Sequence, residues 1–131
     1  MLQIPPTCDL TLGLTRVAGP DGAESVWRTT IDERFLNPAG SLQGGFLAAI
    51  ADSAMGAAAV RAVGERKVFV ANTDLRISFL RPVPPGATLT CTATVVKAGS
   101  LVTFVEAEIV NEDGATVATA SSTYVIRDRT E

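Results

Sequence analysis

The sequence predicts an α+β fold in which a curved antiparallel β-sheet wraps around one long central helix. Its C-terminal half alternates apolar and polar residues in four successive segments bounded by turn residues, which is typical of antiparallel sheet. The segment from Gly44 to about Gly64 is rich in Ala and Leu and apolar on nearly every face, so a helix there must be surrounded. We expect residues 1–131 to form a single domain.

The four strand segments are Val68 to Leu80, Ala87 to Lys97, Leu101 to Asn111 and Ala115 to Ile126. Because Pro82 to Gly86 and Asp113-Gly114 punctuate this region, we interpret the four as a β-meander. In the first strand the alternation predicts a core-facing set, with Asn72 and Asp74 on the opposite face; that set is Phe69, Ala71, Thr73, Leu75, Ile77 and Phe79.

Two weaker strand candidates lie near the N-terminus, Leu10 to Val17 and Ser25 to Ile31. The sequence Gly19-Pro-Asp-Gly22 between them is a dense turn signal. We therefore expect them to pair as a hairpin.

The composition narrows the range of functions. The 131 residues include 11 basic and 14 acidic side chains, a net charge of −3, and no run of Lys or Arg, which argues against a nucleic-acid partner. The apolar stretch from Phe35 to Val60 is interrupted by Pro38 and Asp52, so we expect a buried helix and no membrane partner. With no secretory signal and no CxxC pairing of its two cysteines, the protein is expected to be cytoplasmic and to hold no metal.

The sequence contains no histidine. This excludes Ser-His-Asp and Cys-His catalysis, HExxH metal sites and a His-carboxylate dehydratase pair. Any chemistry must therefore use carboxylates, hydroxyls, amides and backbone dipoles.

Asp52 is the one charged residue between Arg34 and Arg61. Burial without a partner raises the pKa of a carboxyl group, so a chain that keeps a carboxylate in such surroundings usually uses it. The alternative is a structural carboxylate without a catalytic role, which accepts hydrogen bonds from a hydroxyl or amide such as the hydroxyl of Ser53 or a group of a partner subunit. Asp52 is the first candidate for chemistry.

Two motifs carry a resemblance to a known family. Asn37-Pro-Ala-Gly-Ser-Leu-Gln-Gly-Gly-Phe46 followed by Asp52, and then Asp74-Leu-Arg-Ile-Ser-Phe-Leu-Arg-Pro82, resemble the hotdog-fold acyl-CoA thioesterases of the phenylacetate-degradation and 4-hydroxybenzoyl-CoA type. The resemblance covers about residues 30 to 127. It implies a homodimer whose sheets join edge to edge, commonly paired again into a tetramer. Gln43 stands where this family often has His.

The resemblance and the helix geometry together suggest how a thioester would be cleaved. The N–H of Gly44 at the helix start would stabilise the oxyanion, and Asp52 would attack the carbonyl or activate water as a general base. Gly44 and Asp52 are eight residues apart, about 12 Å along one helix, so both can act on one thioester only from different subunits.

Further residues are assigned by the resemblance or by residue type. Asn37 would orient the water or the substrate carbonyl, although Asn-Pro-Ala-Gly is also a plain turn. We expect Gln43, Gly45, Asn72, Thr73 and Arg81 to contact substrate, Asn72 at the position where the family often has a supporting hydroxyl. Candidates for the coenzyme A phosphates are Arg66, Lys67, Arg81 and Lys97. Candidates for lining the acyl pocket are Phe46, Met55, Phe79 and Phe104, although residues of this type at strand and helix spacing more often belong to the core.

The leading hypothesis is an acyl-CoA thioesterase that releases a free acid and coenzyme A, with coenzyme A as part of the substrate and no separate cofactor. A non-catalytic acyl-CoA-binding protein would bind the ligand without releasing thiol. A thioesterase for acyl-carrier-protein or polyketide intermediates would need a basic surface around the pocket mouth, against which the net acidity argues mildly.

Overall fold

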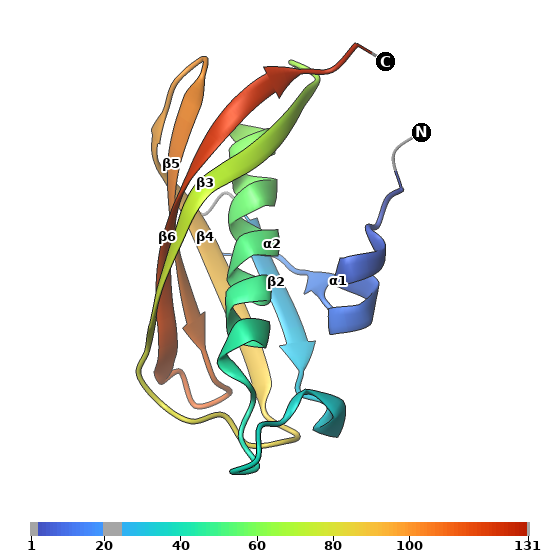
Figure 1. Cartoon of the computed structure of the whole chain (residues 1–131), viewed down its shortest axis with the longest axis vertical. Coiled ribbons are helices and arrows are strands. Elements are labelled where there is room, and N and C mark those ends of the chain that lie inside the picture. Colours follow the sequence, from blue (N-terminus) through green and yellow to red (C-terminus); the bar gives the residue numbers. More distant parts are fainter. Residues whose placement is uncertain (1–2, 20–24, 131) are drawn as a thin grey trace.

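The computed structural model describes residues 3–19 and 25–130, which form an antiparallel sheet curved around one long helix (Figure 1). This is the hotdog arrangement that the sequence predicts. The elements are α1 (Thr7–Leu12), β1 (Thr15–Arg16), β2 (Ser25–Thr30), the 3-10 turn η1 (Glu33–Phe35), α2 (Gly44–Ala62), β3 (Val68–Phe79), β4 (Thr88–Ala98), β5 (Val102–Val110) and β6 (Thr116–Asp128).

The strand order in the sheet is β1-β2-β4-β5-β6-β3, with every neighbouring pair antiparallel. The expected four-stranded meander is therefore wrong in one respect. β4, β5 and β6 follow one another as predicted, but β3 pairs with β6 at the far edge, and β2 pairs with β4. The segment Pro82 to Gly86 belongs to a crossover and not to a hairpin turn, because β5 and β6 lie between β3 and β4 in the sheet.

Helix α2 occupies the concave side of the sheet, as expected. It begins at Gly44, after an extended Gln43, and ends at Ala62, shortly before Gly64 adopts a left-handed φ of 66°. Although α2 is long and apolar enough to cross a membrane, a buried core helix passes the same test. Its buried residues are Leu47, Ile50, Ala51, Ala54, Met55, Ala58 and Ala59, and these pack into the main hydrophobic cluster.

Strand β3 contains a bulge that reverses its expected faces at one end. The register with β6 shifts between Asn72 and Asp74, so Thr73 is the extra residue. The Asp74 carboxylate accepts the main-chain N–H of Thr123 at 3.0 Å, and the Ser122 hydroxyl donates to the Asp74 carbonyl at 2.7 Å. Beyond the bulge, Leu75 and Ile77 pack against the core as predicted, whereas Phe69, Ala71 and Phe79 are exposed in the isolated chain. The bulge turns Asn72 toward α2.

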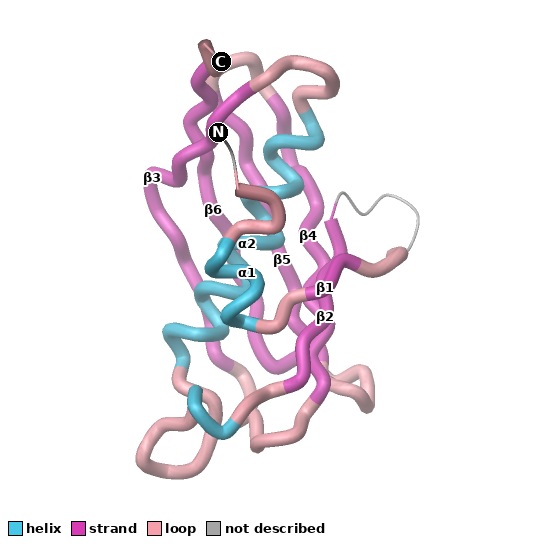
Figure 2. The backbone as a smooth tube through the Cα atoms, turned by 90° about the vertical axis from the view of Figure 1, so that its right-hand side faces the viewer, coloured by secondary structure: helices cyan, strands magenta, loops and turns pink. Residues whose placement is uncertain are grey.

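The N-terminal hairpin is only partly as predicted. β1 pairs with β2, but it is limited to Thr15–Arg16, and residues 7–12 form α1 instead of a strand. Asp9 and Leu12, three residues apart, are the buried positions of α1, and Gly13 ends it with a φ of 67°. The expected turn at Gly19 to Gly22 lies, apart from Gly19, outside the described residues. Figure 2 shows α1 against the side of α2 that the sheet leaves open.

Candidate functional site

Asp52 lies in the middle of α2 and is held by two side chains from the sheet. The Tyr124 hydroxyl donates to Asp52 Oδ1 at 2.6 Å, and Asn72 Nδ2 donates to the same oxygen at 3.0 Å. Tyr124 on β6 and Asn72 on β3 are directly opposite each other in the ladder. The carboxylate is therefore satisfied by a hydroxyl and an amide, and not by its neighbour Ser53.

The Ser53 hydroxyl donates instead to Asp9 at 2.7 Å. Asp9 is only 7% exposed. Its hydrogen bond with Ser53 links α1 to α2 at the residue that follows Asp52. Residue-by-residue reading of the sequence did not single out Asp9, because it lies within a segment that resembles a strand.

Sequence reasoning also missed Tyr124. It is the chain's one tyrosine and is 2% exposed. Burial, followed by the hydrogen bond and charge of Asp52, raises the pKa of the Tyr124 phenol far above its ordinary value, so the phenol is a proton donor at any physiological pH. A signal was available, because a single tyrosine on the core face of a strand needs a partner for its hydroxyl.

The first turn of α2 forms the second part of the site. The first N–H groups of a helix have no acceptor within the helix and carry partial positive charge. Gly44 occupies this position, and Phe79 packs so closely over it that a Cβ there would lie 2.9 Å from Phe79 Cζ. A cleft of about 490 Å³ opens beside this turn; it is lined by Asn37, Ser41, Leu42, Gly44, Leu47, Phe79, Leu80, Arg81, Pro82 and Val83.

Asn37 lines this cleft and also organises the loop before α2. Its Oδ1 accepts the main-chain N–H groups of Ala39 at 2.9 Å and Ser41 at 3.1 Å. This is the turn chemistry that the sequence allows, and it leaves only the amide nitrogen of the side chain for a ligand.

The structure brings some of the predicted substrate residues together and separates others. Arg81 lines the cleft with Asn37 and Gly44, and Gln43 and Gly45 are exposed at the start of the helix beside it. Thr73 is the bulge residue of β3, where its hydroxyl donates to the Thr123 carbonyl at 3.4 Å. Asn72 lies at Asp52, away from the cleft.

Asp52 and the cleft do not meet within one chain. Asp52 is not among the lining residues, and the eight residues of α2 that separate it from Gly44 span about 12 Å. Within one chain, the Gly44 cleft and Asp52 are therefore two separate groups at different positions along α2.

The residues expected to contact coenzyme A or an acyl group are scattered. Arg66 is engaged by Asp128 at 2.6 Å and by the Ser100 carbonyl at 2.6 Å, whereas Lys67, Lys97 and Arg81 are exposed. Of the apolar candidates, only Phe79 lines the cleft. Phe46 packs on Phe35 at the start of α2, Met55 is fully buried in the core, and Phe104 lies 45% exposed on β5.

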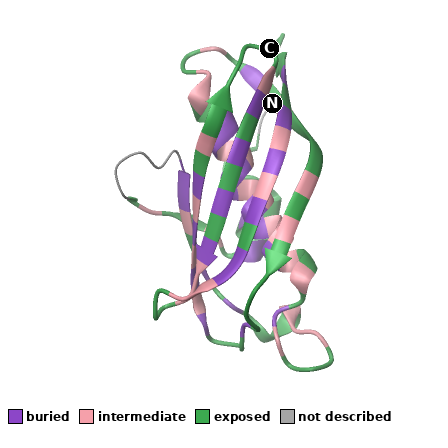
Figure 3. Ribbon diagram, turned by 90° about the vertical axis from the view of Figure 1, so that its left-hand side faces the viewer, coloured by how far each residue is buried: buried purple, intermediate pink, exposed green. Residues whose placement is uncertain are grey.

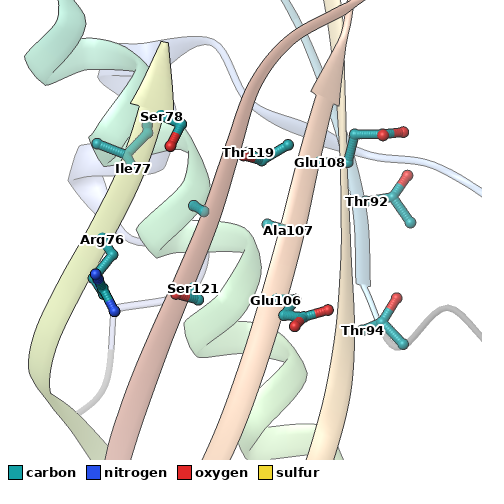
Figure 4. Close-up of a pocket in the computed structure, with 11 residues that line it drawn as sticks. Arg76, Ile77, Ser78, Thr92, Thr94, Glu106, Ala107, Glu108, Thr119 and Ser121 are labelled. Atoms are coloured by element: carbon teal, nitrogen blue, oxygen red, sulfur yellow. The ribbon is translucent and has the colours of Figure 1, made fainter. Parts of the chain in front are cut away.

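Figure 3 shows the outer face of the sheet, which is turned away from α2. A larger hollow of about 810 Å³ lies on this face (Figure 4). It holds none of the predicted site residues. Figure 4 shows Arg76, Glu106 and Glu108 among short Ser and Thr side chains there. The candidate site is therefore the smaller cleft together with Asp52, which hold the predicted helix-start donor and carboxylate.

A cysteine nucleophile is excluded at the core. Cys91 on β4 is 1% exposed, and burial raises the pKa of its thiol to about 12. The thiolate needed for attack is thus absent near neutral pH.

A curved antiparallel sheet wrapped around one long central helix defines a hotdog protein. The model of the thioesterase superfamily matches residues 39–118, and the chain belongs to this family of thioester hydrolases. No curated protein matches the chain.

Solved structures agree with this assignment. The E. coli PaaI protein of the phenylacetic acid degradation operon is 30% identical, with 92% of this chain and 84% of that chain covered and a TM-score of 0.81. A putative thioesterase of Ralstonia eutropha, described as related to phenylacetic acid degradation, is 32% identical over 95% and 92% of the two chains, with a TM-score of 0.82. A Streptococcus mutans protein bound to acetyl-CoA shares the fold at 19% identity, over 90% and 91%, with a TM-score of 0.79.

Proposed function

We propose that this protein hydrolyses an acyl-CoA thioester to a free acid and coenzyme A. The observation that carries the proposal is Asp52, a carboxylate held on the central helix by Asn72 and Tyr124 in a chain of the thioesterase superfamily. The acetyl-CoA bound to the Streptococcus mutans protein of the same fold favours a coenzyme A ester.

The proposed chemistry uses two groups. The Gly44 N–H donates to the thioester oxygen as negative charge develops on it, an interaction worth a few kcal/mol (about 3) in the transition state. Asp52 either takes a proton from water, which attacks the carbonyl carbon, or attacks that carbon itself to give an anhydride that water then opens. In both routes the C–S bond breaks and coenzyme A leaves as the thiol. Asn37 orients the water or the carbonyl through its amide nitrogen, and Gln43, Gly45, Thr73 and Arg81 are proposed to contact the substrate.

The proposed site spans two subunits. β3 is an edge strand of 12 residues that pairs only with β6 among the described strands, and such a long edge is suited to pairing with a second copy. Phe79 and Leu80, at 55% and 57% exposed, extend the apolar surface at that edge. We therefore propose a homodimer in which two β3 strands continue one sheet.

The helix offers a matching surface. Gly45, Ala48, Ala49 and Asp52 follow one stripe of α2, and none of them is fully buried in the isolated chain. Residues this small let two antiparallel helices approach closely. A twofold axis passing near Ala48, midway between the two groups, would bring Gly44 of one helix beside Asp52 of the other.

The outer face of the sheet is proposed to pair two dimers into a tetramer. Phe69, Phe104 and Val125, at 47%, 45% and 37% exposed, give it an apolar end, and Glu106, Glu108 and Arg76 surround the polar hollow beside it. Exposed apolar residues of this kind on one sheet face favour an interface. We further propose a cytoplasmic enzyme that needs no metal or separate cofactor, with nucleic acid and membrane excluded as partners.

The test is free-thiol release from acetyl, medium-chain, phenylacetyl and hydroxybenzoyl coenzyme A esters, run beside Asp52→Asn. The substitution keeps the shape and removes the base, so we expect turnover to fall by about 10³-fold or more while the oligomer survives. Near-normal turnover in the variant would remove Asp52 from the mechanism. Acyl-CoA binding without thiol release would instead favour a non-catalytic acyl-CoA-binding protein. Thiol release only from acylated carrier protein would favour a thioesterase for acyl-carrier-protein or polyketide intermediates.

A further inference from the structure

Tyr124, on strand β6, donates a hydrogen bond to Asp52, although the proposed reaction gives Tyr124 no chemical step. Its hydroxyl lies 2.6 Å from Asp52 Oδ1 and 3.2 Å from the main-chain carbonyl oxygen of the same residue. The ring crosses the interior of the subunit to do so and is 2% exposed. A phenylalanine would fill the same space, so packing alone does not account for the hydroxyl.

The two donors to Asp52 converge on one oxygen. Asn72 Nδ2 and the Tyr124 hydroxyl both donate to Oδ1, and the two residues are opposite each other across β3 and β6. Two donors fix the plane of a carboxylate and satisfy one of its oxygens, so the other oxygen is the one available to react.

The local fold is arranged around this contact. The bulge at Thr73 turns Asn72 to the inner face, beside Tyr124. On α2, one turn after Asp52, Gly56 lies against the same ring, and a Cβ added there would be 3.8 and 3.9 Å from Tyr124 Cε1 and the hydroxyl oxygen. The phenol thus lies along the helix with little freedom to turn away from Asp52.

On the basis of the proposed function, we infer that Tyr124 is a positioning residue that orients Asp52 and stabilises its charged form, leaving one carboxylate oxygen to act on the thioester or its water. The protein has no histidine to do this. A neutral phenol is suited to the role because its raised pKa keeps the proton on oxygen throughout the working range. Asn72 shares the task from the facing strand.

The first experiment compares kcat and KM of Tyr124→Phe, which removes only the hydroxyl, with those of the wild type. We expect kcat to fall about 10- to 100-fold with KM changed less than about twofold, as for loss of one hydrogen bond to a charged group. A loss of kcat without a matching change in KM is the signature of a misoriented reacting group and not of weakened substrate binding. A wild-type kcat would overturn the inference.

Thr103→Val is the matched control. Thr103 pairs with Tyr124 across β5 and β6 and is fully buried, and its hydroxyl has no hydrogen-bond partner among the described residues. Thr103→Val, like Tyr124→Phe, removes one buried hydroxyl from the sheet at this position. The hydroxyl that it removes is not bonded to Asp52. If it reproduced the kinetic changes of Tyr124→Phe, those changes would reflect general disturbance of the core and the inference would fall.

The second experiment does not depend on turnover. With one tyrosine in the chain, ¹³Cζ labelling gives a single NMR signal, whose chemical shift should differ between wild type and Asp52→Asn because the acceptor of the Tyr124 hydroxyl changes from a carboxylate to an amide. The same chemical shift in the two proteins would contradict the inference. If the wild type released no thiol from any acyl-CoA, the proposed function would fail, whereas this comparison would still decide whether the Tyr124 hydroxyl is bonded to the Asp52 side chain.

Discussion

At the scale of single residues, the candidate site depends on the side chains that donate hydrogen bonds to the Asp52 carboxylate. The expectation of an unpaired aspartate in apolar surroundings was wrong, because Asn72 and Tyr124 both donate to Asp52. Asp52 itself stood out from the sequence as an isolated charge. Its partners did not, since one comes from a strand whose faces are reversed by a bulge and the other from a strand 72 residues away.

A second buried group leads to a prediction about stability at alkaline pH. Burial raises the pKa of Cys91 from 9.0 to about 12, so the folded protein binds this proton more tightly than the unfolded chain. The resulting stabilisation is fully present below pH 9 and is lost as pH rises toward 12. Over that interval the free energy of unfolding should fall by about 1.4 kcal/mol per pH unit from this group.

Denaturant unfolding of wild type and Cys91→Ala between pH 8 and about pH 11 measures this contribution. The variant starts from lower stability because of the cavity, but its curve should decline less steeply with pH. Parallel curves would show that the Cys91 thiol does not titrate differently in the two states. Tyr124 also destabilises the fold at high pH, and it does so equally in both proteins.

At the scale of elements, periodicity predicted α2 and the strands of the C-terminal half, and it failed where an element departs from regular period. Counting alternate residues cannot reveal the extra residue at Thr73, so Asn72 was assigned to the wrong face. Leu10, Leu12 and Leu14 alternate like a strand, yet Asp9 and Leu12 are buried at helical spacing. The pairing of β3 with β6 was missed because it is a long-range contact between strands that are distant in the sequence.

The bulge in β3 can be tested through Asp74. Asp74→Ala removes the acceptor for the Thr123 N–H, which should lower the free energy of unfolding by about 1 kcal/mol. Because the bulge aims Asn72 at Asp52, kcat should also fall, by about tenfold. Thermal unfolding and thiol release measure the two effects.

Asp74→Asn is the matched control, since its amide oxygen still accepts the Thr123 N–H. It should retain most of the stability and turnover of the wild type. If Asp74→Ala kept wild-type kcat, the bulge would not be needed to position Asn72.

At the scale of the whole molecule, the account requires more than one chain. Gly44 and Asp52 lie about 12 Å apart along α2, and the cleft at Gly44 does not include Asp52. The proposed site therefore combines the helix start of one subunit with the aspartate of another. The sequence predicted this separation because helix rise is fixed, whereas the contacts between subunits depend on surface shape that periodicity does not encode.

The decisive measurement is activity of mixed dimers formed from two inactive variants, Asp52→Asn and Gly44→Pro. Proline at the first helical position removes the N–H without breaking the helix, and the extended Gln43 before it, at φ −66° and ψ 135°, suits a residue preceding proline. Gly44→Ala is the control for Gly44→Pro. Both variants add a Cβ that contacts Phe79, but the alanine keeps its main-chain N–H.

Co-expression of the two variants gives half mixed dimers, each with one intact site of two. If Gly44 and Asp52 act across the subunit interface, about one quarter of wild-type thiol release should return. Mixed dimers as inactive as their parents, alongside an active Gly44→Ala protein, would contradict a site shared between subunits.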